Sequence, residues 1–245
     1  MAMNEKKDTI YASEMSKVED FAFDRNVADV FDDMLHRSIP GYGAIIHQMG
    51  SFAARYVGPD TNVYDLGCSL GAATFAVRSS VNLPGCQIHA VDLSADMIAR
   101  FKQRLSRHVG VVPVTAHCMD VADLNIENAS LVIMNFTLQF IDFEKKEQIL
   151  QHIYDGMTSD GALVLSEKVV CDDPAEQQFI ESTYFDLKRF NGYNDLEISQ
   201  KRNALENVLK LDSPSMHMSR LRKIGFSRVS EWYRNLNFAS FIAEK

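Results

Sequence analysis

Apolar and polar positions follow two different periods along this chain, and the change of period marks its organisation. In the stretch 24–38 (DRNVADVFDDMLHRS), apolar residues recur at the three-to-four spacing of an amphipathic helix, and Asp24 is placed to cap its first turn. A second helix is predicted over 43–57, after the break at Ile39-Pro40-Gly41. The stretch 24–57 is therefore expected to form a helical cap on the domain that follows.

From residue 62 onward, short apolar runs alternate with helical patterns. Strands are predicted at 62–66, 87–91, 112–117, 130–134 and 161–166, with helices over 70–80, 94–108 and 144–157. This alternation is typical of βαβ units, in which a parallel sheet is covered by helices on both faces. Ligands of such sheets bind outside the carboxyl ends of the strands.

The last third of the chain changes character again. Residues 174–224 have a helical pattern with breaks at 191–193 and 212–214, and the stretches 226–233 and 236–243 have the pattern of two strands joined by a tight turn. We interpret 171–224 as a helical insertion before an antiparallel hairpin that closes the sheet. The expected fold is α/β and Rossmann-like, with a mostly parallel seven-stranded sheet. Residues 1–20 are predicted to be a mobile N-terminal segment, and 21–245 a single domain.

Composition narrows the class of protein without changing this picture. The 245 residues are 46% hydrophobic and 24% charged, which is ordinary for a globular domain, and the net charge of −8 argues against extensive nucleic-acid binding. No apolar run reaches the roughly 18 residues of a membrane span, and the polar N-terminus does not resemble a secretory signal. The four cysteines form no C-x-x-C pair, and reduced thiols in the cytoplasm are the simplest interpretation.

The loop VYDLGCSLGAAT (63–74) allows two kinds of chemistry. The segment from Gly67 to Gly71 fits G-x-S-x-G, the nucleophile elbow of serine hydrolases, and it also fits a glycine loop that receives a nucleotide-like ligand between a strand and a helix. The hydrolase is disfavoured because Ser69 follows the first strand of the sheet and no His-Gly dipeptide occurs upstream. Asp212 and His217 lie downstream in the order Asp then His, but any long chain offers such a pair by chance. Ser69 is therefore expected to be a loop residue.

One polar residue stands at the end of, or just after, each of the first four predicted strands: Asp65, Asp92, Asp120 and Asn135. Taken singly, each could be a helix cap, a turn former or a solvated acid. Together they converge on one crevice, where Asp92 is placed to accept hydrogen bonds from ribose hydroxyls and Asp120 to reach an adenine.

The ligand predicted from this set is an adenosyl compound without phosphates. A dinucleotide fingerprint, G-x-G-x-x-G, would need glycines at positions 67, 69 and 72, whereas this chain has Ser69 and Ala72 at the last two. The second glycine lets the backbone approach a pyrophosphate closely, so its absence favours S-adenosyl-L-methionine. The histidines show no metal spacing, and no metal is expected.

The ordered set resembles class I S-adenosyl-L-methionine-dependent methyltransferases, and longer motifs resemble one family within them. These motifs are FDRNVADVFDDMLHRSIPGY (23–42), VYDLGCSLGAAT (63–74), NFTLQF (135–140), GALVLSEK (161–168), KRFNGYNDLEISQKRNALENV (188–208) and the closing W-x-x-x-x-NF (232–238). They resemble the carboxy-S-adenosyl-L-methionine synthase family from about residue 20 to the C-terminus, and NGY-x-x-LEISQKR lies outside the generic methyltransferase loop.

This resemblance implies an unusual reaction. Such enzymes carboxylate the methyl group of S-adenosyl-L-methionine, with prephenate as the carboxyl donor, and release phenylpyruvate. The product is used by a separate enzyme that modifies the wobble uridine of tRNA, and the family is homodimeric. The carboxylated product is expected to co-purify with the protein, which is expected to bind no nucleic acid or membrane directly.

The resemblance also implies a set of site residues. Asp92 would hold the ribose, Asp120 and Val121 the adenine end, and Arg202 the added carboxylate, for which its planar fork is suited. Leu93 stands where an asparagine is common in the family, and it can still contact adenine through its backbone and apolar side chain. The ligand-binding set is Tyr42, Gly67, Cys68, Ser69, Asp92, Leu93, Asp120, Val121, Asn135 and Arg202, with Arg202 also the catalytic candidate.

Three other interpretations remain at this point. An ordinary methyltransferase acting on a small molecule and a non-catalytic S-adenosyl-L-methionine-binding module both fit the strand-end residues. Arg202 is also open to a plain interpretation, because Lys201, Asp195, Glu197 and Glu206 are interleaved with it as on a solvated helix face.

Overall fold

The computed structural model describes residues 6–245 and has a single seven-stranded sheet at its centre. The strands lie in the order β3-β2-β1-β4-β5-β7-β6. The first five are mutually parallel, and β7 pairs antiparallel with both β5 and β6. Their bounds are β1 Asn62–Leu66, β2 Gln87–Asp92, β3 Val114–Cys118, β4 Ala129–Asn135, β5 Met157–Lys168, β6 Arg228–Asn235 and β7 Phe238–Glu244.

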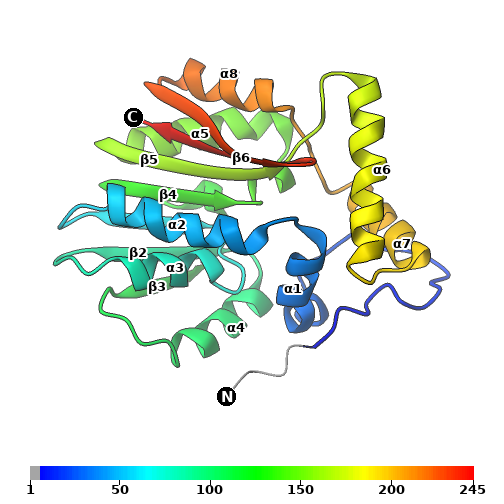
Figure 1. Cartoon of the computed structure of the whole chain (residues 1–245). Helices are drawn as coiled ribbons and strands as arrows, with labels where there is room; N and C mark the ends of the chain where they lie inside the picture. Colours follow the sequence, from blue (N-terminus) through cyan, green and yellow to red (C-terminus); the bar gives the residue numbers. More distant parts are fainter. Residues whose placement is uncertain (1–5) are drawn as a thin grey trace.

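Helices cover both faces of this sheet (Figure 1). Their bounds are α1 Arg25–Ser38, α2 Tyr42–Tyr56, α3 Ala72–Ser80, α4 Ala95–Leu105, α5 Phe143–Gly156, α6 Pro174–Phe190, α7 Asp195–Glu206 and α8 Pro214–Ile224. Successive residues of β1 point to opposite faces, so Val63 packs with α2 and α3 whereas Tyr64 packs with α5 and α8. The central strands β1 and β4 are therefore buried on both sides, which explains the apolar run in β4, whereas the outer strands β3 and β6 are partly exposed.

The predicted fold is confirmed, with shifts at the ends of several elements. The third strand begins at Val114 rather than at 112, and β5 begins at Met157, four residues before its predicted start. The C-terminal hairpin is present, two residues later than predicted. Asp24 caps α1 as expected, accepting a hydrogen bond of 2.9 Å from the Val27 backbone N–H.

The stretch 171–224, interpreted from sequence as one insertion, divides into two parts in space. Helices α6 and α7 lie beside α1, beyond the carboxyl ends of the strands (Figure 1), whereas α8 packs against α5 and β6. Leu221 of α8 is fully buried, and Phe226 just after it also joins the core. Within 171–224, only α6 and α7 therefore lie outside the layers that cover the sheet. The assignment of 21–245 as a single domain stays a prediction.

The N-terminal segment, predicted to be mobile, lies against α1 and α7 over its described part. Residues 1–5 fall outside the described residues, and Asp8 and Tyr11 are buried. Asp8 accepts a hydrogen bond of 2.8 Å from the Tyr193 hydroxyl, and the Met15 N–H donates to Gln200 at 2.8 Å. Some of the polar groups in this segment therefore form specific hydrogen bonds with the rest of the protein. The mobility of the segment stays a prediction.

Candidate active site

The loop between β1 and α3 is shaped by glycines and tied to β2. Gly67 has a φ of +81°, and a Cβ built on it would lie 2.2 Å from Thr137 Oγ1, so no side chain fits there. The backbone N–H groups of Gly67 and Cys68 both donate to Val91 O, at 2.8 and 2.9 Å. The loop therefore lies against the end of β2 without side chains between them.

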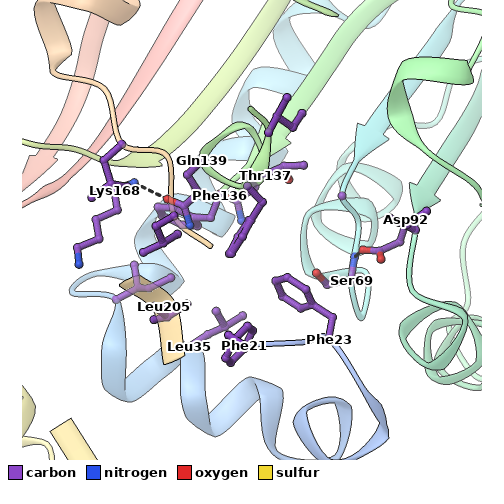
Figure 2. A pocket seen from close by; sticks show the side chains of 18 of the residues that line it. Phe21, Phe23, Leu35, Ser69, Asp92, Phe136, Thr137, Gln139, Lys168 and Leu205 are labelled. Carbon is purple, nitrogen blue, oxygen red and sulfur yellow. Dashed lines mark hydrogen bonds between the residues drawn. The ribbon is translucent and has the colours of Figure 1, made fainter. Parts of the chain in front are cut away.

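Asp92, the last residue of β2, fixes the same loop from the other side. One carboxylate oxygen accepts from the Ser69 N–H at 2.9 Å (Figure 2), and the other accepts from the Ser94 N–H at 2.8 Å. Burial raises the pKa of Asp92, while these two backbone donors lower it. Each oxygen keeps a lone pair for a ligand hydroxyl, because a carboxylate oxygen accepts two hydrogen bonds.

Asp65, at the end of β1, has a more structural role than its neighbour. It accepts hydrogen bonds from Thr74 of α3, at 2.9 Å from the N–H and 2.5 Å from the hydroxyl. Burial raises its pKa to about 6, against the effect of these donors. For Asp65 the interpretation as a helix-capping acid is thus correct, although the residue also borders the cavity described below.

The serine hydrolase interpretation is wrong on geometry. Within residues 6–245, the Ser69 hydroxyl donates to no histidine, and the two downstream candidates lie in a separate buried cluster. Asp212 pairs with Lys146 at 2.8 Å and with Arg220 at 3.0 Å, while His217 packs against the ring of Phe241. Asp212 is therefore fully engaged by two cations and orients no catalytic imidazole.

A cavity of about 1070 Å³ opens at the carboxyl ends of β1, β2 and β4. Figure 2 shows Ser69 and Asp92 on one side of it and Lys168 on the other, with Phe21, Phe23 and Phe136 between them. All the residues predicted to bind the ligand border this one cavity: Tyr42, Gly67, Cys68, Ser69, Asp92, Leu93, Asp120, Val121, Asn135 and Arg202. The structure thus brings the predicted set together, and the roles assigned to its members stay predictions.

The nucleotide end of the cavity, defined by Asp92, Asp120 and Asn135, is rich in acceptors. Among the described residues, Asn135 Oδ1 is buried and has no hydrogen-bond partner, so it offers an acceptor to a ligand donor such as an ammonium group. Asp120 is exposed and accepts from the Ala122 N–H at 2.9 Å. Leu93 is 71% exposed, which leaves its side chain free to cover a flat ring. This donor-poor, acidic end fits the cationic S-adenosyl-L-methionine.

The opposite end of the cavity, defined by Lys168, Lys188, Lys201 and Arg202, is cationic. Lys201 donates to Ser38 Oγ at 3.2 Å and lies 3.6 Å from Asp8 Oδ2. Burial lowers the pKa of Lys201 to about 8, although Asp8 opposes this effect. Arg202 is exposed at the cavity, with its guanidinium carbon 6.0 Å from the centre of the Phe185 ring. Arg202 therefore borders the cavity and is not only part of a solvated helix face.

Sequence analysis missed part of this cationic end. Lys168 is the last residue of β5, two residues beyond the predicted end of the fifth strand at 166, so a charged residue near that strand end is the signal that points to it. Phe21 and Phe23, which border the cavity from the N-terminal side, carry no such signal in the sequence.

With the geometry described, comparison with known proteins identifies the family. A carboxy-S-adenosyl-L-methionine synthase of Shewanella frigidimarina is 48% identical over 243 residues, and the alignment covers 99% of this chain and all of that protein. The enzyme of the same name from Shewanella oneidensis is 50% identical with the same coverage. This chain belongs to the carboxy-S-adenosyl-L-methionine synthase family. Its residues 64–163 also match the family model described as a methyltransferase domain.

Solved structures agree with this family at the level of the fold. The magnesium protoporphyrin IX methyltransferase of Synechocystis, solved with bound S-adenosyl-L-methionine, is 15% identical with a TM-score of 0.57, covering 90% of this chain and 84% of that one. An O-methyltransferase family protein of Burkholderia thailandensis has a TM-score of 0.63 at 16% identity, covering 91% of this chain and 60% of that one. The predicted class I methyltransferase fold is thereby confirmed, and this carboxy-S-adenosyl-L-methionine synthase family member is an S-adenosyl-L-methionine-dependent enzyme.

Two properties of the described residues bear on cofactors and membranes. Across 6–245, no group of three or more His, Cys, Asp or Glu side chains is arranged to hold a metal ion. None of the helices in this range combines the length and apolar character needed to cross a bilayer.

Proposed function

We propose that this enzyme converts S-adenosyl-L-methionine and prephenate to carboxy-S-adenosyl-L-methionine and phenylpyruvate. The observation that carries the proposal is a single cavity with an acceptor-rich nucleotide end and a cationic end. A cationic substrate fits the first end. The second end suits carboxylates, because ammonium and guanidinium groups bind them through charge-assisted hydrogen bonds.

The overall reaction balances without an external oxidant or reductant. One C–H bond of the substrate methyl group breaks, and a C–C bond forms to the carboxyl group that leaves the donor. The donor ring becomes aromatic by losing this carboxyl group and its hydroxyl, and the hydroxide takes up the methyl proton as water. The side chains must therefore hold both substrates in register and stabilise carboxylates; they need not supply electrons.

The residues divide this work according to their place in the cavity. Asp92 would accept from the ribose hydroxyls while keeping the glycine loop in place. Asn135 would accept from the ammonium of the amino-acid portion, since its Oδ1 is buried without a partner in the described chain. Arg202 would bind the new carboxylate with its guanidinium fork.

An ordinary methyltransferase is the second candidate, and the same fold and nucleotide end favour it. Methyl transfer alone, however, gives no use to cations gathered opposite the nucleotide end. To separate the two, purified protein is incubated with S-adenosyl-L-methionine and prephenate, and phenylpyruvate is measured by its absorbance. We expect phenylpyruvate only when both substrates are present. Its absence under saturating conditions contradicts the proposal and favours the ordinary methyltransferase or a non-catalytic binding module.

We further propose a cytoplasmic homodimer whose product serves a separate enzyme that modifies the tRNA wobble uridine. The net charge of −8 supports the absence of direct RNA binding by this chain. Phe179 and Phe190 of α6 are 66% and 89% exposed, which favours this helix as part of a contact between copies. Light scattering during size exclusion tests the dimer: the mass of two chains is expected, and a monomeric mass contradicts it.

A further inference from the structure

Two lysines at the cationic end lack the partner that a buried ammonium group ordinarily needs. Lys188 of α6 is 5% exposed, and its Nζ forms no hydrogen bond or ion pair with any residue in 6–245. Lys168 of β5 is partly buried, and its Nζ is likewise without such a partner within this range. Both residues line the cavity, so each ammonium group is largely removed from bulk water and has access only to the cavity. A desolvated cation without a partner is costly, and an anion bound in the cavity would pair with it.

The two ammonium groups lie against the same aromatic ring. Lys168 Nζ is 5.4 Å and Lys188 Nζ 5.1 Å from the centre of the Tyr184 ring, so the two atoms are no farther apart than the sum of these distances. Tyr184 is buried, and its hydroxyl donates to Ser38 O at 3.0 Å. The ring is therefore fixed, and both cations lie close to it in the same cavity.

The surrounding charges leave these cations unsatisfied. Burial lowers the pKa of Lys188 to about 7, and repulsion from Lys201 and Lys168 adds to this effect while Asp8 opposes it. The pKa of Lys168 is also lowered, chiefly by burial, with Glu181 opposing this shift and Arg202 adding to it. Asp8 is already engaged by Lys201 and Tyr193.

We propose that Lys168 and Lys188 bind a carboxylate of a dicarboxylate second substrate and thereby determine its specificity. Arg202 then remains available for the carboxyl group that is transferred. The rings of Tyr184 and Phe185 give this part of the cavity an aromatic wall, which suits a donor with a six-membered ring between its carboxylates. This inference rests on the proposed function, of which it names the second-substrate subsite.

The test compares Lys188→Met and Lys168→Met with Lys223→Met. Lys223 lies on α8, outside the cavity, and pairs with Glu147 at the surface. Each cavity variant should raise the KM for prephenate about tenfold to a hundredfold, the loss of one charge-assisted contact, and leave the KM for S-adenosyl-L-methionine unchanged. Lys188→Arg should recover part of the loss, and Lys223→Met should behave as the wild type.

Thermal unfolding separates this role from a structural one. Removing an unpaired buried cation should leave the melting temperature of Lys188→Met unchanged or higher, whereas a lysine needed for packing would lower it. An unchanged KM for prephenate, or equal rises in KM for both substrates, contradicts the proposal.

Calorimetry distinguishes failure of the subsite from failure of the proposed function. Prephenate is titrated into protein saturated with S-adenosyl-L-homocysteine, with wild type and Lys188→Met compared. Binding that depends on Lys188 supports the subsite even if no phenylpyruvate forms, in which case only the proposed function is overturned. Binding that is independent of Lys188, or no binding by the wild type, overturns the subsite whatever the activity.

Discussion

Replacing Asp92 by asparagine tests both the loop architecture and ligand binding. The carboxylate accepts from two backbone N–H groups, at 2.9 Å from Ser69 and 2.8 Å from Ser94. An amide has only one acceptor oxygen, so its NH₂ group would face one of these two donors. The variant therefore loses one charge-assisted bond, worth about 1.5–3 kcal/mol, and weakens the other by about 1 kcal/mol.

The net effect on stability is smaller than this sum. Burial of the Asp92 charge already costs free energy, as its raised pKa shows, and an amide avoids that cost. We expect the free energy of unfolding to fall by about 1–3 kcal/mol, which lowers the melting temperature of a chain of this size by a few to about ten degrees. Affinity for S-adenosyl-L-methionine should fall about tenfold to a hundredfold, because the carboxylate would also accept from ribose hydroxyls.

The assay is differential scanning calorimetry together with titration of both adenosyl ligands. The carboxylated product should weaken as much as S-adenosyl-L-methionine, since both contain the same ribose. Asp160→Asn, on an exposed part of β5 that does not border the cavity, is the matched control. If Asp92→Asn lowers the melting temperature but leaves both affinities unchanged, Asp92 only caps the loop, and its assignment to ribose is refuted.

Three further variants follow from the same site. Gly67→Ala should destabilise the fold by at least about 1–2 kcal/mol, because the residue has a positive φ and its Cβ would lie 2.2 Å from Thr137 Oγ1. A chemical denaturation curve equal to that of the wild type would contradict this expected loss of stability. Arg202→Leu should weaken binding of the carboxylated ligand by about 2–4 kcal/mol, or thirtyfold to a thousandfold, and leave the affinity for S-adenosyl-L-methionine nearly unchanged. Equal losses of affinity for both ligands in calorimetry would show that Arg202 does not bind the added carboxylate. The KM for prephenate should rise as pH increases through about 7, because Lys188 loses its proton there in the free enzyme. Lys188→Arg should flatten this rise in a kinetic pH profile, and an identical profile in both proteins argues against protonated Lys188 as the anion ligand.

The sheet and the nucleotide end could be predicted from sequence because both depend on local pattern. Buried parallel strands such as β4 are continuous apolar runs, and the residue after each run lies at the same edge of the sheet. This pattern predicts that Asp92, Asp120 and Asn135 lie around one crevice, and all three border the cavity. It failed to separate Asp65, since only the structure shows that its carboxylate is engaged by Thr74.

The cationic end depends on contacts that no local pattern records. Asp8 bonds to Tyr193, 185 residues away in sequence, and also approaches Lys201. The local sequence there shows only a polar stretch, which predicts a mobile end, whereas the burial of Asp8 and Tyr11 is a tertiary property. Likewise, the break before α8 is visible in the sequence, but its packing against α5 and β6 is a tertiary property.

The most direct test of the proposed reaction follows the carboxyl group itself. Prephenate labelled with ¹³C in its ring carboxylate is incubated with the purified enzyme and S-adenosyl-L-methionine, and the adenosyl products are analysed by mass spectrometry. The account predicts carboxy-S-adenosyl-L-methionine that carries the label, in amounts equal to the phenylpyruvate released. Unlabelled S-adenosyl-L-homocysteine as the main product, or phenylpyruvate without a labelled adenosyl compound, would contradict carboxyl transfer.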